Sequence, residues 1–185
     1  MRPEKIMLMR HAEKPTLDGS DLGVAEFGQS DARALSVKGW QRAGALIGLF
    51  APPEGGRHRP GLARPDAIYA AAAAGRNDSL RPQHTVLPLA RCLGLEIRSQ
   101  FGKDEVDELA DELTAQDCRT VLVCWEHKVI PKLASRLLDA AARAPAAWPA
   151  ERFDMVWVFD RHGDGGCDFQ QVPQRLLFRD SDMAI

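Results

Sequence analysis

Two histidines and two arginines stand in this 185-residue chain where a packed interior does not need them. The apolar stretch KIMLM is followed at once by Arg10 and His11, and the apolar stretch TVLVC leads through a tryptophan and a glutamate to His127. Arg81 comes from a third segment between them. Guanidinium groups match the oxygens of a phosphoryl group, often with two hydrogen bonds at once. If the fold brings these four side chains together, they form a phosphoryl pocket.

Three further residues are candidates for binding a substrate. Lys14 follows the first histidine by three positions, and it either steers an anionic substrate or is an ordinary exposed lysine. Arg76 precedes Arg81 in the same segment, and it is either a third phosphate contact or a solvated loop residue. Glu126 lies directly before the second histidine.

The pattern of strands and helices must position these residues. Period-2 and apolar runs predict strands over residues 5–10, 66–70, 95–99, 120–125, 153–160 and 168–178. Helical periodicity and capping signals predict helices over 37–50, 78–93, 104–116 and 129–142. This alternation predicts one domain over residues 1–185. We expect a three-layer α/β/α sandwich with a mostly parallel central sheet and an antiparallel edge hairpin at its end.

Both histidines are predicted to stand at the carboxyl ends of strands, where open α/β sheets bind their ligands. The helix that follows the first strand is expected to begin after Ser36 as its N-cap. Helical spacing predicts that one face of this helix contains Val37, Trp40, Gly44 and Ile47.

Composition excludes several classes of protein. The chain is 45% hydrophobic with a formal net charge of −2, so no overall positive field favours nucleic acid or an anionic membrane. No apolar run is long enough to span a bilayer, and the short IMLM run is too small for a signal peptide. We therefore expect a cytoplasmic protein. The four cysteines have no CxxC spacing, which favours buried free thiols at Cys92, Cys118, Cys124 and Cys167.

Taken in order, the motifs resemble the histidine phosphatase superfamily in its phosphoglycerate mutase-like branch. The family opens with a strand ending in R-H-G, and this chain has Arg10, His11 and Ala12. A helix patterned L-[ST]-x-x-G-x-x-A follows, close to residues 35–43. Next comes R-x-x-x-T, matched by residues 81–85, and a later strand delivers the second histidine. The resemblance covers almost the whole chain.

The resemblance implies a phosphatase that acts through a phosphohistidine on His11, with no metal or cofactor. Arg10, Arg81 and His127 are then the donors that stabilise the transferred group. The implied substrate is a phosphorylated small molecule or a phosphoprotein. Two alternatives stay open at this point, namely a phosphotransferase of the phosphoglycerate mutase type and a non-catalytic phosphate-binding or regulatory protein. The sequence predicts no oligomeric state.

Four carboxylates are candidates for the general acid. Family members often use a glutamate some way after the second arginine, which points to Glu105 or its neighbour Asp104. An acidic first helical turn also explains these two residues, since the helix dipole favours it. Glu13 and Glu126 are rivals because each stands beside a catalytic candidate. Ala12 departs from the family's glycine, and it is tolerated if that position does not need a positive φ.

Two other motifs match catalytic signatures but are interpreted as structural. The RHG at residues 161–163 has glycines and aspartates around it and lies between two strand patterns, which favours a hairpin turn. The C-x5-R spacing from Cys92 to Arg98 encloses bulky apolar residues, whereas a phosphate loop needs small ones. A helix ending at Gly94 explains this segment, with Cys92 in the core.

Overall fold

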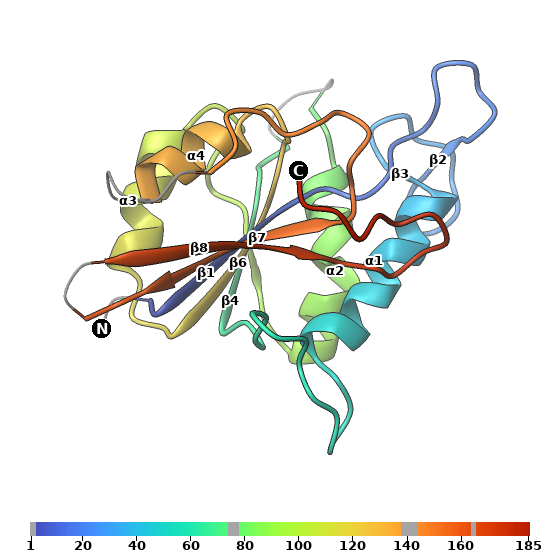
Figure 1. The fold of residues 1–185 in the computed structure, drawn as a ribbon. Helices are drawn as coiled ribbons and strands as arrows, with labels where there is room; N and C mark the ends of the chain where they lie inside the picture. The colour runs from blue at the N-terminus through green and yellow to red at the C-terminus, as the bar shows by residue number, and fades with distance from the viewer. Residues whose placement is uncertain (1–2, 74–77, 138–143, 164–165) are drawn as a thin grey trace.

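A six-stranded sheet forms the centre of the computed structural model, which describes residues 3–73, 78–137, 144–163 and 166–185 (Figure 1). The strand order is β5-β4-β6-β1-β7-β8. Their bounds are β1 Lys5–Arg10, β4 Ala67–Ala70, β5 Ile97–Arg98, β6 Thr120–Trp125, β7 Met155–Arg161 and β8 Cys167–Pro173. Strands β5, β4, β6 and β1 are parallel, while β7 and β8 form an antiparallel hairpin at one edge. The predicted sheet is thus confirmed.

Two pairs of helices cover the two faces of the sheet (Figure 1). Helices α1 (Val37–Phe50) and α2 (Arg81–Leu93) pack on one face. Helices α3 (Val106–Ala115) and α4 (Ile130–Leu137) pack on the other. The three-layer α/β/α architecture predicted from the sequence is confirmed.

The first strand shows why the sheet needs both layers. Ile6 and Leu8 join the core under α3 and α4, whereas Met7 and Met9 join the core under α1 and α2. All four are 0–1% exposed. A strand that is apolar on both faces is stable only when both faces are covered, which is typical of parallel sheets.

The register of two central strands fixes where the site forms. Arg10 at the end of β1 pairs with Trp125 at the end of β6. The chain leaves β1 toward α1 on one face and leaves β6 toward α4 on the other. A crevice therefore opens at the carboxyl ends of these neighbouring strands, as at other topological switch points.

The first helix confirms its predicted cap but not its predicted face. The Ser36 side chain accepts a hydrogen bond from the backbone N–H of Gly39 at 3.2 Å. The face named from spacing is not the one that α1 buries: Val37 is 56% exposed, and the buried residues are Gly39, Arg42, Ala43, Leu46, Leu49 and Phe50. The buried face contains an arginine, so it looks polar in the sequence.

Several element ends also differ from the predictions. Helix α2 begins at Arg81 and not at residue 78, with a proline in its first turn. Strand β8 ends at Pro173, five residues before the predicted end. A small antiparallel pair, β2 (Gly23–Val24) and β3 (Leu35–Ser36), was not predicted, because two-residue strands have no period to detect.

The cysteines and the decoy motifs are mostly as predicted. All four cysteines lie in the described part of the chain and none of them is in a disulfide; Cys124 and Cys167 are buried and Cys118 is partly buried. Cys92 is exposed, so its predicted place in the core is wrong. Gly94 caps α2 in the left-handed conformation, at φ 67°. The 161–163 motif stands at the end of β7 in the edge hairpin. Among the described residues, no helix has the length and apolar character needed to cross a bilayer.

Candidate active site

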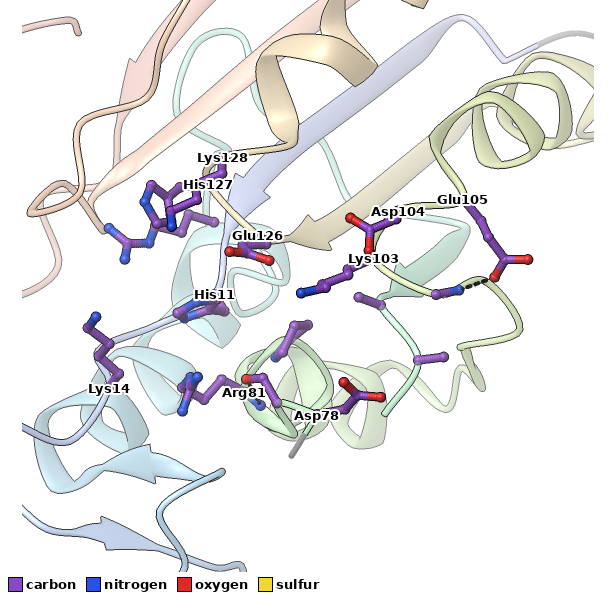
Figure 2. A pocket seen from close by; sticks show the side chains of 16 residues that line it. His11, Lys14, Asp78, Arg81, Lys103, Asp104, Glu105, Glu126, His127 and Lys128 are labelled. Atoms are coloured by element: carbon purple, nitrogen blue, oxygen red, sulfur yellow. Dashed lines mark hydrogen bonds between the residues drawn. The ribbon is translucent and has the colours of Figure 1, made fainter. Parts of the chain in front are cut away.

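A pocket of about 500 Å³ opens at the carboxyl ends of β1, β4 and β6. Its lining gathers segments that are far apart in the sequence, and Figure 2 shows their side chains along an elongated space, with His11 toward one side and Glu105 toward the other. The lining residues are Arg10, His11, Lys14, Ala71, Ala72, Asp78, Ser79, Arg81, Pro82, Gly102, Lys103, Asp104, Glu105, Glu126, His127 and Lys128.

The pocket brings together every predicted site residue that the structure describes. The four phosphoryl-pocket candidates, both substrate-binding candidates Lys14 and Glu126, and the acid candidate Glu105 all line it. Arg76 lies outside the described residues. Their catalytic roles stay predictions, since geometry alone does not test a reaction.

His11 is held in a defined protonation state. Its residue is 5% exposed, and its Nδ1 lies 2.8 Å from the carbonyl oxygen of Ala12. A carbonyl only accepts, so Nδ1 carries the proton and Nε2 carries the lone pair. Burial lowers the pKa of His11 to about 3, and nearby Arg10 and Arg81 act in the same direction. The imidazole is therefore a neutral base with Nε2 available as a nucleophile.

Ala12 fits the site in place of the family's glycine. It is fully buried, and its N–H donates to the hydroxyl oxygen of Thr85 at 2.8 Å. Among the described non-glycine residues, only Arg175 and Arg179 have a positive φ. The condition stated for tolerating alanine at this position is met.

Arg10 is buried with part of its hydrogen-bonding capacity unused. Its Nη1 donates to the carbonyl oxygens of Ala150 and, at 3.3 Å, of Arg152. Its guanidinium carbon lies 3.8 Å from the centre of the Phe153 ring, a cation–π contact. Its Nε is buried without a partner among the described residues. Burial lowers its pKa to about 10, which leaves it charged at neutral pH.

Arg81 reaches the pocket from the first position of α2. Its Nη1 donates a hydrogen bond to the carbonyl oxygen of Ala32 at 3.1 Å. Its Nε is buried and has no partner in the part of the chain that is described. Burial lowers its pKa. Thr85 donates to the Arg81 carbonyl oxygen at 2.7 Å while it accepts from Ala12, so one hydroxyl couples this helix to the histidine loop.

His127 completes the group on the β6 side. Its Nδ1 is buried and has no partner in the described structure. Burial, followed by the charges of Arg10, Lys128 and Lys14, lowers its pKa to about 4. The family resemblance implied a hydrogen-bond donor to the transferred group here. In the free protein this imidazole is neutral, so it contributes an N–H and not a charge.

The four carboxylates proposed as acids are placed very differently. Glu13 points away from the pocket and pairs with Arg42. Glu105 lines the pocket, but its carboxylate accepts the N–H of Gly102 at 2.5 Å, and Figure 2 shows it at the far end from His11. Asp104 stands near that end as well.

Glu126 stands beside the nucleophile by sheet register. Because Arg10 and Trp125 are paired as the last residues of β1 and β6, the residues that directly follow the two strands are His11 and Glu126. Adjacent strands lie about 4.8 Å apart. The charge of Glu126 also raises the pKa of both guanidiniums, at Arg10 and Arg81, against the effect of burial. Figure 2 shows its side chain in the pocket beside His11.

Three residues in and around the pocket were missed in the sequence. Lys103 and Lys128 line the pocket wall, and Phe153 covers Arg10. Trp125 holds the Lys103 loop, because its indole N–H donates to the Lys103 carbonyl oxygen at 2.9 Å. The position of Lys128 directly after the second histidine was a usable signal. Phe153 precedes β7, and it comes near Arg10 because β7 pairs with β1. A contact between segments so far apart leaves no local pattern in the sequence.

Solved structures of low sequence identity share this architecture. The protein histidine phosphatase SixA, solved with tungstate, matches with a TM-score of 0.58 at 15% identity over 92% of this chain and 97% of that one. A mycobacterial glucosyl-3-phosphoglycerate phosphatase matches with a TM-score of 0.54 at 16% identity over 94% and 98%. Phosphoglycerate mutase from Plasmodium falciparum matches with a TM-score of 0.50 at 13% identity over 98% of each chain.

No protein-family model and no curated protein matches the chain. The likeness in three dimensions extends over more than nine-tenths of its length, and it includes both the mostly parallel sheet and the antiparallel hairpin. The chain therefore has the fold that these phosphatases share with phosphoglycerate mutase.

Proposed function

We propose that this protein is a phosphatase that hydrolyses a phosphomonoester or a related phosphoryl bond through a phosphohistidine on His11. One observation carries the proposal. A neutral imidazole has its Nε2 in a pocket that also holds two guanidiniums, each with a buried N–H group for which the described residues provide no partner. A buried N–H group without an acceptor costs free energy, and a ligand that accepts its hydrogen bond removes this cost. An oxyanion of the size of a phosphoryl group supplies the missing acceptors.

In the first step, the Nε2 lone pair of His11 attacks phosphorus and the bond from phosphorus to the leaving oxygen breaks. Arg10 and Arg81 donate to the non-bridging oxygens, whose charge they neutralise as it develops. His127 donates a further N–H. The leaving oxygen takes a proton from the Glu126 carboxyl, so the alcohol departs neutral.

In the second step, water attacks the phosphohistidine on the same face that the alcohol has left. The Glu126 carboxylate takes a proton from this water while the phosphorus–nitrogen bond breaks and the lone pair returns to Nε2. Inorganic phosphate leaves, and both residues are restored. Glu126 is favoured over Glu105 in this role because it directly follows the neighbouring strand β6, as His11 directly follows β1.

The substrate is proposed to be a phosphorylated small molecule or a phosphoprotein. The pocket volume of about 500 Å³ admits more than a phosphate group, and its rim residues Lys14 and Lys103 are exposed. Similar structures include a protein histidine phosphatase and a glucosyl-3-phosphoglycerate phosphatase, which agree with hydrolysis but differ in substrate. The cytoplasmic location expected from the sequence stays a prediction.

The test is phosphate release from p-nitrophenyl phosphate, followed by a panel of phosphorylated metabolites and a phosphohistidine protein. We expect turnover by the wild-type chain and its loss, by about four orders of magnitude, in His11→Ala. His162→Ala is the matched control, since that histidine belongs to the edge hairpin and not to the pocket. It should retain full activity.

The outcomes separate the three candidate functions. Phosphate release that depends on His11 supports the phosphatase. Transfer of the phosphoryl group to a second metabolite, with little release to water, supports a phosphotransferase. Binding of inorganic phosphate without any turnover across the panel contradicts both enzymes and supports a regulatory protein.

A further inference from the structure

The loop that carries His11 is held from several sides. The N–H of Ala12 donates to Thr85, and the carbonyl oxygen of Glu13 accepts from the N–H of Ser36 at 3.0 Å. These bonds fix the backbone on both sides of the peptide bond between Ala12 and Glu13. That peptide bond matters because its carbonyl is the acceptor that keeps the proton of His11 on Nδ1.

The side chain of Glu13 is anchored as firmly as its backbone. Both of its oxygens accept from Arg42, with Nη2 at 2.8 Å and Nε at 3.0 Å. Arg42 is 2% exposed and Glu13 is 7% exposed, so the pair is sealed from solvent. A bidentate guanidinium–carboxylate pair fixes orientation as well as distance.

The other side of Arg42 is bound by the C-terminal segment. Asp180 accepts two bonds, from Nη2 at 2.7 Å and from Nη1 at 3.0 Å, and the Gln174 side-chain oxygen accepts from Nη1 at 2.9 Å. Asp180 also accepts the N–H groups of Leu176 and Leu177. One buried guanidinium thus joins residues 174–180 to the histidine loop.

We propose that Glu13, Arg42 and Asp180 form a positioning network for the nucleophile. A peptide unit is planar, so holding the Glu13 end of the unit also orients the Ala12 carbonyl at its other end. The correctly oriented carbonyl keeps Nδ1 protonated and turns Nε2 toward the pocket. The C-terminal segment is then part of the catalytic apparatus although it does not line the pocket. This inference rests on the proposed role of His11.

The charge balance explains why all three members are needed. Two buried carboxylates share one guanidinium, with Lys38 at 3.7 Å from Glu13 as a partly exposed further cation. Removing one carboxylate leaves Arg42 with unpaired donors in a site closed to water. The guanidinium is then free to shift, and Glu13 shifts with it.

The test compares Asp180→Asn with Asp182→Asn. Asp182 belongs to the same segment, but it is 71% exposed and pairs with Arg175 outside the network. Asp180→Asn should speed hydrogen exchange at the amides of residues 11–13 by about tenfold. It should also lower kcat on p-nitrophenyl phosphate by about tenfold while KM stays within about twofold, because binding groups are unchanged and orientation is lost. Asp182→Asn should change none of these values.

Arg42→Lys is a second variant that tests the same network if Asp180→Asn folds poorly. Lysine keeps the charge but has no planar fork, so it should give the same local exchange and the same selective loss of kcat. Unchanged exchange at residues 11–13 in both variants overturns the proposal, as does an equal acceleration over the whole chain. If the wild-type chain has no phosphatase activity, the proposed function fails, and the local exchange data still decide whether the network positions this loop.

Discussion

The protonation state of single side chains decides whether this pocket is reactive. The Nδ1 of His11 donates to a backbone carbonyl, and burial lowers the pKa of the ring to about 3. The hydrogen bond fixes the tautomer with its proton on Nδ1, although it raises the pKa, and burial outweighs it. Nε2 therefore stays unprotonated throughout the physiological pH range. The chain thus obtains a nucleophile without needing a carboxylate next to the ring, unlike triads in which an aspartate orients the histidine.

This histidine should make folding stability depend on pH. Its pKa is about 3 in the folded chain and near 6.5 in an unfolded one. As the pH falls below about 6.5, the unfolded chain takes up a proton that the folded chain does not, so stability falls. Between pH 7 and pH 5 this group alone should cost about 2 kcal/mol.

Urea unfolding at pH 7 and pH 5 measures the effect. Carboxylates lose stability over part of the same range, so the informative quantity is the difference between the wild-type chain and His11→Asn. The variant should lose about 2 kcal/mol less than the wild type on acidification. An equal loss in both proteins would contradict a neutral, buried His11.

The leaving-group acid is open to a second test at a single residue. If Glu126 protonates the leaving oxygen, Glu126→Gln should lower kcat/KM about 100-fold for an alkyl phosphate, whose alkoxide is a poor leaving group. For p-nitrophenyl phosphate the loss should be only a few-fold, since nitrophenolate needs no proton. Glu105→Gln is the comparison that matters. A substrate-dependent loss in that variant, with Glu126→Gln unaffected, assigns the acid to Glu105 as first predicted from the sequence.

At the scale of elements, packing of α1 against the histidine loop is unusually tight. A Cβ added to Gly39 would lie 2.4 Å from the carbonyl oxygen of Glu13 and 3.0 Å from the Cβ of Leu35. The first contact is with backbone, which cannot move without moving the loop. Gly44 lies in the same helix, is exposed, and has open space where its Cβ would be.

These two glycines make a matched pair of substitutions. Gly44→Ala should stabilise the chain by about 0.5–1 kcal/mol, because alanine has the higher helix propensity. Gly39→Ala should destabilise it by about 1–3 kcal/mol through overpacking, and should lower kcat as well. Urea unfolding and p-nitrophenyl phosphate kinetics measure both. Similar stabilisation in the two variants would show that α1 has room to move away from the loop.

Elements with a strong pattern were the ones that the sequence predicted well. Strand β6 was predicted with its correct ends, because TVLVCW is apolar after its first residue and β-branched in half its positions. The buried face of α1 was not identified from the sequence, since Arg42 looks like a solvent-facing residue until Glu13 and Asp180 are seen around it. Pairing between distant buried charges leaves no trace in local periodicity.

The pocket itself was predictable for a related reason. Histidine and arginine directly after an apolar strand conflict with local packing rules, and such conflicts mark function. What the sequence did not reveal is which carboxylate faces His11. That depends on the register between β1 and β6, which are separated by more than 100 residues along the chain.

At the scale of the whole molecule, positive charge is concentrated at the pocket although the chain as a whole is slightly negative. The chain carries a formal net charge of −2, yet Arg10, Arg81, Lys14 and Lys128 converge at one end of the sheet. Three other residues at the opposite end, Lys5, Arg64 and Arg119, have acidic partners or neighbours in Glu4, Asp66 and Asp160. Carboxylates line the pocket too, so the difference lies in the buried Nε groups of Arg10 and Arg81, which have no partner among the described residues. An oxyanion should therefore bind preferentially at this end of the molecule.

Binding of inorganic phosphate should stabilise the entire fold, because the free site leaves buried donors of Arg10 and Arg81 unpaired. A ligand at 100 times its Kd adds about 2.7 kcal/mol to the free energy of unfolding. In a chain of this length that corresponds to a rise in Tm of about 5–10 °C. A thermal melt with increasing phosphate, at constant ionic strength, measures the rise.

Two arginine variants make this measurement specific. Arg81→Ala removes one set of unpaired donors and should abolish most of the rise. Arg119→Ala removes an exposed charge that pairs with Glu4 beyond the other end of β6, and it should leave the rise intact. If phosphate stabilises both variants as much as the wild-type chain, the anion binds elsewhere on the surface. The convergence of the two guanidiniums at the ends of β1 and α2 would then serve packing alone, and the case for a phosphoryl pocket would lose its physical basis.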